Sequence, residues 1–101
     1  TNIEAFILDS SRVITLAAKE HAVPQIYVGV KSNSIGIMLN GQYYDALATS
    51  EPYIYSVDLA DYTRKGTYTF EILNGNDILA SGQKFEIKKM GMSENAGLFD
   101  F

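Results

Sequence analysis

Residues Thr67–Ile87 read TYTFEILNGNDILASGQKFEI, and this stretch decides the fold because apolar and polar side chains alternate on both sides of a turn. Such alternation is expected when one face of a sheet is buried and the other meets water. Asn74–Asp77 is rich in residues that tolerate positive φ, which predicts a tight hairpin turn. Ser81–Gly82 predicts a bulge in the returning strand. The side chains expected to face the core are Tyr68, Phe70, Ile72, Phe85 and Ile87.

The same rhythm runs through most of the chain, with a β-rich run and then a turn signal roughly every 8–12 residues, as in sandwiches. Asn40–Gly41 predicts another tight hairpin turn, and Ala46–Pro52 is expected to be a loop. The expected strands span residues 3–8, 25–31, 35–39, 42–44, 53–59, 67–73 and 78–87. One face of the run at 53–59 is expected to carry Tyr53, Tyr55, Val57 and Leu59.

The segment after Ser10 has two readings. Ser10 could cap a helix over residues 11–21, whereas the β-branched run Val13–Thr15 favours a strand. With at most one helix, a parallel architecture is excluded, because it needs several helical crossovers. The sequence therefore predicts an all-β domain, an antiparallel sandwich of about seven strands. Its interior is expected to contain Ile26, Ile37, Val57, Phe70 and Ile72.

The stretch Asp61–Phe70, DYTRKGTYTF, resembles the E–F corner of immunoglobulin-like and fibronectin-III-like sandwiches. In that corner an acidic residue precedes a glycine, and a tyrosine and a core residue follow at alternate positions. The resemblance implies an immunoglobulin-like β-sandwich in which the Tyr68 hydroxyl bonds back to upstream backbone. It places Gly66 in the corner and Phe70 where antibody domains carry their second cysteine. Modules of this kind without cysteine occur in phage structural proteins and bacterial surface proteins.

Composition fits one small domain and excludes several classes of function. A chain of 101 residues is one domain by length, and we expect a sandwich at residues 1–89 with a tail at 90–101. Without cysteine, the chain forms neither a disulfide nor a thiolate metal site. A net charge of −4 and the lack of a basic stripe argue against nucleic acid and anionic lipid as partners. No apolar run reaches the ~20 residues that span a bilayer. Localisation stays open, with a virion or an extracellular surface among the candidates.

No pattern of residues predicts catalysis, a cofactor or a metal site. His21 is the only histidine, and one histidine without cysteine cannot make a typical zinc site. Glycoside hydrolysis needs two carboxylates across a cleft, whereas Asp58 is expected on a solvated strand face and Asp61 in a corner. No phosphate-binding glycine loop is present. We therefore expect a protein that is not an enzyme and holds no cofactor.

Three tyrosines near loops suggest a ligand-binding surface. Tyr43, Tyr44 and Tyr62 are the candidates for an aromatic platform that binds carbohydrate. The competing interpretation is that strand tyrosines are half-buried sheet residues, which their preference for strands favours. A carbohydrate-binding or adhesion module is therefore the alternative function.

The C-terminus is unusually apolar, because the chain ends Leu98-Phe99-Asp100-Phe101 and free ends are normally polar. Burying one phenylalanine contributes about 1.5–3 kcal/mol, so this tail is expected to dock on its own domain or in a partner's groove or sheet edge. The sequence thus favours a non-enzymatic structural module, a subunit or decoration protein of a larger assembly such as a phage virion. Its partner would be another protein or a further copy, bound through sheet edges and Leu98, Phe99 and Phe101.

Overall fold

The structure, a computed structural model, describes residues 2–90 and contains eight strands and one short 3-10 helix in that range. The strands are β1 Ala5–Ile7, β2 Val13–Leu16, β3 Gln25–Val28, β4 Ile35–Leu39, β5 Gln42–Ala48, β6 Ile54–Val57, β7 Gly66–Asn74 and β8 Asp77–Lys89. The helix, η1, spans Asp9–Ser11. Of the two readings for the segment after Ser10, the strand is confirmed, as the β-branched run of β2 favours.

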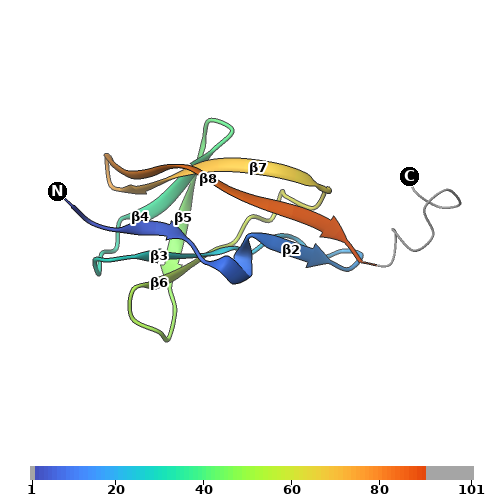
Figure 1. The fold of residues 1–101 in the computed structure, drawn as a ribbon, viewed down its shortest axis with the longest axis horizontal. Helices are drawn as coiled ribbons and strands as arrows, with labels where there is room; N and C mark the ends of the chain where they lie inside the picture. The colour runs from blue at the N-terminus through green and yellow to red at the C-terminus, as the bar shows by residue number, and fades with distance from the viewer. Residues whose placement is uncertain (1, 91–101) are drawn as a thin grey trace, which may run out of the picture.

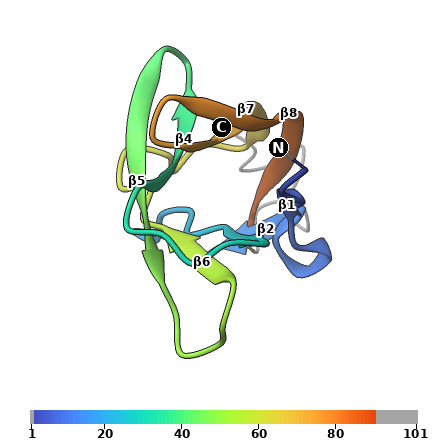
Figure 2. The ribbon, with the colours of Figure 1, turned by 90° about the vertical axis from the view of Figure 1, so that its left-hand side faces the viewer.

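All eight strands form one sheet in the order β1-β3-β6-β5-β4-β7-β8-β2 (Figure 1). Neighbouring strands are antiparallel except for β2 and β8, which are parallel. The sheet curls into a half-barrel, as the view along the molecule in Figure 2 shows. The prediction of an antiparallel, immunoglobulin-like sandwich of about seven strands is therefore wrong. The chain is all-β as expected, but it forms a single mixed sheet.

Strand β5 is the reason that two sheets do not separate. Gln42–Asp45 pairs with β4, whereas Ala46–Ala48 pairs with β6. In Figure 2, β5 runs along one side of the molecule from beside β4 to beside β6. We expected a strand at 42–44 and a loop at Ala46–Pro52, but the backbone stays extended to Ala48. Alanine has a low preference for strands, and pairing with β6 overrides it.

The core lies inside the curl of the sheet. All five residues predicted to share one interior are buried in a single cluster, so that prediction is confirmed: Ile26, Ile37, Val57, Phe70 and Ile72. Phe85 and Ile87 of β8 are buried with them, and Tyr68 packs against the cluster while partly exposed. Period-two alternation therefore identified the buried face of the central strands.

Both predicted hairpin turns and the predicted bulge are present. Asn40 and Gly41 adopt φ values of 53° and 76°, and Gly75 adopts 63°. Gly82 adopts a φ of 69°, and the β7–β8 register shifts between Phe70 and Ile72. Such a shift is expected where one strand of a pair contains an extra residue.

Candidate functional site

Two of the three candidate platform tyrosines lie together, but they do not form a flat surface. The rings of Tyr44 and Tyr62 are 6.0 Å apart with an interplanar angle of 77°. The rings of Tyr62 and Tyr68 have their centres 5.1 Å apart and an interplanar angle of 86°. Hydrogen bonding with Tyr62 raises the pKa of Tyr44 above its ordinary value, with partial burial as a second cause. Edge-to-face rings of this kind pack favourably with one another, and they do not offer a coplanar stacking surface.

Tyr43 points to the opposite face of the sheet, because adjacent strand residues alternate. Its ring covers Gly36 of β4, and its hydroxyl donates a hydrogen bond to the Ser34 carbonyl at 3.4 Å. Burial raises the pKa of Tyr43 above its ordinary value, and the Asp45 carboxylate adds to the shift. The structure therefore separates Tyr43 from Tyr44 and Tyr62.

The corner residues keep their local geometry within a different architecture. The Tyr68 hydroxyl donates to the Arg64 carbonyl at 2.8 Å, which is the hydrogen bond that the resemblance implied. Gly66 begins β7 with a φ of 152°. Phe70 is 2% exposed, and the centre of its ring lies 6.0 Å from the centre of the Phe85 ring. The motif therefore describes a strand corner that does not require two separate sheets.

His21 has a partner that its sequence neighbourhood does not reveal. Its Nε2 atom pairs with the Asp58 carboxylate at the surface, where the two side chains are 36% and 65% exposed. Within residues 2–90, no group of three or more histidine, aspartate or glutamate side chains could hold a metal ion. The same part of the chain contains no helix that is long and apolar enough to cross a membrane.

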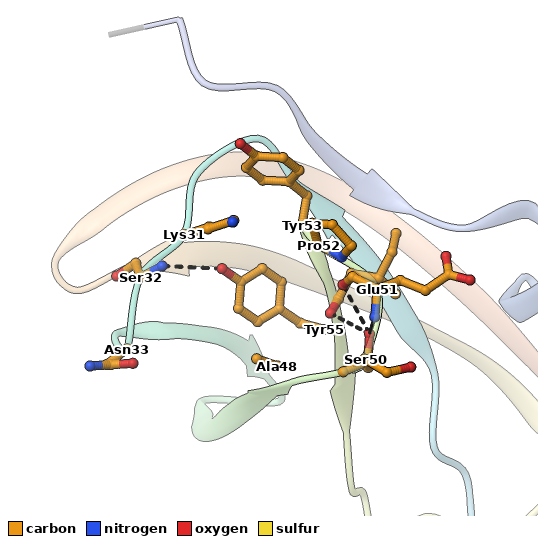
Figure 3. A pocket seen from close by; sticks show the side chains of 11 residues that line it. Lys31, Ser32, Asn33, Ala48, Ser50, Glu51, Pro52, Tyr53 and Tyr55 are labelled. Atoms are coloured by element: carbon orange, nitrogen blue, oxygen red, sulfur yellow. Dashed lines mark hydrogen bonds between the residues drawn. The ribbon is translucent and has the colours of Figure 1, made fainter.

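A hollow that the sequence patterns did not predict lies between the β3–β4 and β5–β6 loops (Figure 3). Its volume is about 570 Å³, and its lining includes Lys31, Asn33, Glu51 and Tyr53. We expected Tyr53 to begin a strand and to share a face with Tyr55, but β6 begins at Ile54, and Tyr53 is 40% exposed with a φ of 69°. Tyr53 therefore lies in the turn before β6, where strand alternation does not apply.

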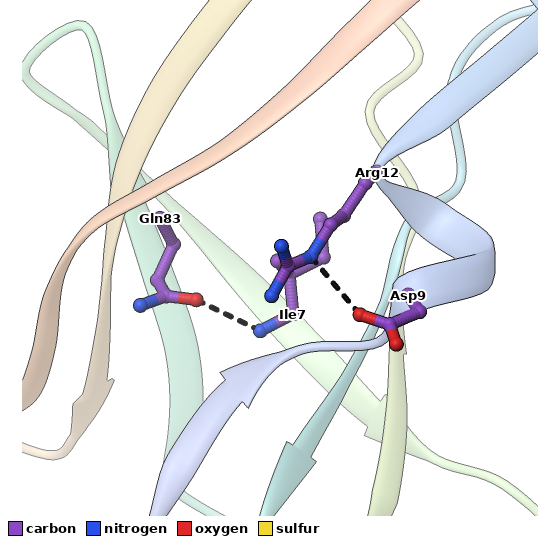
Figure 4. Close-up of polar contacts among 4 residues, drawn as sticks. All are labelled: Ile7, Asp9, Arg12 and Gln83. Atoms are coloured by element: carbon purple, nitrogen blue, oxygen red, sulfur yellow. Dashed lines mark hydrogen bonds and ion pairs between the residues drawn. The ribbon is translucent and has the colours of Figure 1, made fainter.

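The outer edge of β1 is capped by a side chain. β1 pairs with β3 on one side, and on the other side the Ile7 N–H donates to the Gln83 Oε1 atom of β8 at 2.9 Å (Figure 4). Arg12, which is ion-paired with Asp9 at 3.2 Å, lines the same gap. Gln83 follows the bulge glycine of β8, so the bulge and the cap are adjacent in the chain. This edge is therefore poorly suited to accept another strand.

Among residues 2–90, no side chain caps the outer edge of β2 in this way. β2 pairs only with β8 among the described strands. The Arg12 carbonyl accepts a hydrogen bond from Glu86 of β8, and the Leu16 carbonyl accepts one from Met90, the residue after β8. Alternate residues of a strand bond to the same neighbour. The backbone N–H and C=O groups of Ile14 are therefore also directed toward β8. Those of Val13 and Thr15 are directed to the other side of the strand, away from the sheet.

The composition of β2 does not protect this edge. Natural edge strands usually carry lysine, proline or a bulge that prevents pairing with another chain. Val13–Leu16 reads VITL, with no charge and no proline, and its register with β8 is continuous. Val13 is 49% exposed. At the end of the strand, Glu20 caps the Ala17 N–H at 2.7 Å, so the open edge is confined to β2.

The predicted partner-binding residues Leu98, Phe99 and Phe101 lie outside the described residues. Their docking stays a prediction. The described chain ends at Met90, whose N–H donates to the Leu16 carbonyl at 2.7 Å. The tail therefore starts beside the end of the β2 edge.

Comparison with known proteins gives a family but no characterised relative. No curated protein and no solved structure matches the chain. One family model matches residues 3–90, which covers every strand of the half-barrel. The chain therefore belongs to the family described as Domain of unknown function (DUF7862).

Proposed function

We propose that this protein is a non-catalytic structural module that assembles with further copies of itself by pairing strands at the β2 edge. The observation that supports this function is that the backbone groups of Val13 and Thr15 have no partner among the described residues, in a strand without protecting residues. Strand addition at a sheet edge is a common way for proteins to recognise one another, since main-chain hydrogen bonds supply the affinity.

A second copy of the chain fits this edge by symmetry. If two β2 strands meet antiparallel about a two-fold axis at Ile14, Val13 of each copy faces Thr15 of the other. Residues placed opposite in this way exchange two hydrogen bonds, so the two pairs form four. Both copies use the same surface, which is the usual arrangement in a two-fold dimer.

The edge alone gives a weak contact. Stable interfaces bury about 1,200–2,000 Å² in total, more than two four-residue strands provide. We expect the apolar tail to supply a second contact, because the residue before it, Met90, lies beside Leu16. Burying Phe99 and Phe101 in the neighbouring copy would contribute about 3–6 kcal/mol before the ordering of the tail is subtracted.

A phage virion was suggested by modules with a two-sheet architecture, which this chain does not have. A subunit or decoration protein of a larger assembly fits a domain that joins copies through one edge.

The test is the mass of the full chain in solution, measured by light scattering or sedimentation from about 10 μM to 1 mM, the range where a weak dimer dissociates. We expect the mass to rise with concentration above the 11.2 kDa of one chain. Thr15→Pro should keep the protein monomeric, since it removes an N–H that points away from β8 and edge strands tolerate proline there.

Matched variants separate the edge from general effects of charge. Thr15→Lys should also prevent association, whereas Thr67→Lys, at an exposed position of the interior strand β7 opposite Glu86, should not. Phe99→Ala with Phe101→Ala in the full chain should weaken association without unfolding the domain. A mass of one chain at every concentration, or equal association of Thr15→Lys and wild type, would refute the proposed contact.

A further inference from the structure

The hollow beside Tyr53 has the shape and lining of a small-ligand site. Figure 3 shows Lys31, Ser32 and Asn33 on one loop and Ser50–Tyr53 on the other, with Tyr55 between them. The volume of about 570 Å³ lies within the range of sites that hold small molecules. The hollow is separate from the β2 edge, because it is lined by the β3–β4 and β5–β6 loops.

Tyr53 is held in a conformation that bulky residues rarely adopt. Its φ of 69° is a genuine outlier for an aromatic side chain. The turn before it is fixed by Thr49, whose hydroxyl donates to the Ile54 carbonyl at 2.9 Å and accepts from the Glu51 N–H at 3.2 Å. The Val28 N–H bonds to the Tyr53 carbonyl at 2.9 Å. Strain that the surrounding structure enforces in this way is concentrated at ligand sites.

The opposite wall of the hollow is also fixed in place. The Tyr55 hydroxyl donates to the Val30 carbonyl at 2.7 Å and accepts a hydrogen bond from the Ser32 N–H at 3.1 Å. The Ser32 hydroxyl donates to Asn74 Oδ1 at 2.8 Å. Both loops are therefore ordered before a ligand arrives, which lowers the entropic cost of binding.

The lining combines an aromatic ring with polar groups of both charges. Tyr53 is 40% exposed, and the Lys31 ammonium lies 5.6 Å from the centre of its ring. Within the described residues, neither Lys31 nor Glu51 forms an ion pair. Asn33 and Ser50 add a side-chain amide and a hydroxyl.

From this lining we infer that the hollow binds a neutral saccharide. The apolar face of a sugar ring packs against an exposed tyrosine, and its hydroxyls both donate and accept hydrogen bonds. Lys31 offers donors and Glu51 offers acceptors, which suits a ligand that has many hydroxyls and no net charge. An anionic ligand would meet the Glu51 carboxylate and a cationic one the Lys31 ammonium.

The test is a titration of the full chain, followed by the amide resonances. The probes are glucose, galactose, mannose, N-acetylglucosamine, lactose and cellobiose, each added to about 50 mM so that millimolar binding is visible. We expect at least one sugar to give saturable shifts confined to residues 31–33 and 49–55. Tyr53→Ala should weaken that binding at least tenfold, and Tyr53→Phe should retain most of it.

The matched control is Tyr43→Ala, because Tyr43 has the same exposed fraction of 40% but covers Gly36 elsewhere on the sheet. It should bind the sugar as wild type does. Absence of shifts for all six sugars would overturn the inference, and so would unchanged binding by Tyr53→Ala. Tighter binding of glucuronate or phosphate at the same amides would show an anion site instead of a saccharide site. None of these outcomes depends on whether the protein dimerises through the β2 edge, so the two proposals are tested separately.

Discussion

Gly36→Ala should destabilise the protein only while Tyr43 is present. Gly36 lies buried in β4 with an ordinary extended backbone, so alanine meets no conformational obstacle there. A Cβ atom at this position would lie 2.2 Å from the Tyr43 hydroxyl oxygen, 2.3 Å from Cζ and 2.6 Å from Cε1. These distances are far below contact, so the ring must swing away from the sheet.

The expected magnitude follows from two opposing terms. A fully buried large side chain contributes about 1.5–3 kcal/mol, so displacing Tyr43, already 40% exposed, costs about 1–2 kcal/mol. Replacing a glycine inside a strand by alanine recovers about 0.5–1 kcal/mol. In the wild-type background Gly36→Ala should therefore lower the free energy of unfolding by about 0–1.5 kcal/mol. In a Tyr43→Ala background only the second term remains, and the same change should raise it by about 0.5–1 kcal/mol.

The assay is a double-mutant cycle. Urea denaturation of wild type, the two single variants and the double variant gives four free energies of unfolding, and the difference between the two Gly36→Ala effects is the coupling energy. We expect a coupling of about 1–2 kcal/mol with a change of sign between backgrounds. Equal destabilisation in both backgrounds would show that Tyr43 is not what requires glycine at this position.

Three further changes test the core, the corner and the outer face. Ile37→Ala, at a fully buried position, should cost about 2–5 kcal/mol in urea denaturation; a cost under about 1 kcal/mol would contradict the described core. Tyr68→Phe removes the hydrogen bond to Arg64 and should cost about 0.5–1.5 kcal/mol, a loss that an unchanged denaturation midpoint would exclude. Burial raises the pKa of Tyr43 in the folded protein. Just above pH ~10 the Tyr43 phenol therefore stays protonated in the folded state, whereas it loses its proton in the unfolded chain. Stability should therefore fall as pH rises through this range, less steeply in Tyr43→Phe, and equal slopes would contradict that cause.

Alternation predicted the strands and the core because it reports a local property, the burial of one face. Ile35–Leu39 was predicted with its final boundaries, and Phe70 and Ile72 were placed on the buried face. The Asn40–Gly41 turn was predictable since few residues tolerate its backbone angles. Each of these features depends on residues close together in the sequence.

Sheet topology and the candidate sites depend on distant residues, and the sequence did not reveal them. Ala46–Ala48 is a strand only because β6 lies beside it. The unpaired edge of β2 follows from its parallel pairing with β8, which no local pattern announces. Tyr53 was expected in a strand on the same face as Tyr55, but it lies in the turn before β6 and is 40% exposed. Tyr43 and Tyr44, two of the candidate platform residues, are adjacent in β5 and therefore point to opposite faces of the sheet.

The parallel pairing of β2 with β8 also sets the order in which the molecule can form. Val13 lies beside Glu86, so β2 has no partner strand until β8 is in place, whereas β1 pairs with the nearby β3. Contacts between such distant residues slow folding, because a long loop must close before they form. During synthesis on the ribosome, β2 has no partner strand until β8 has emerged. An exposed, unpaired strand can pair with a neighbouring nascent chain. Copies made side by side on one messenger RNA would therefore meet at β2 while it still has no partner.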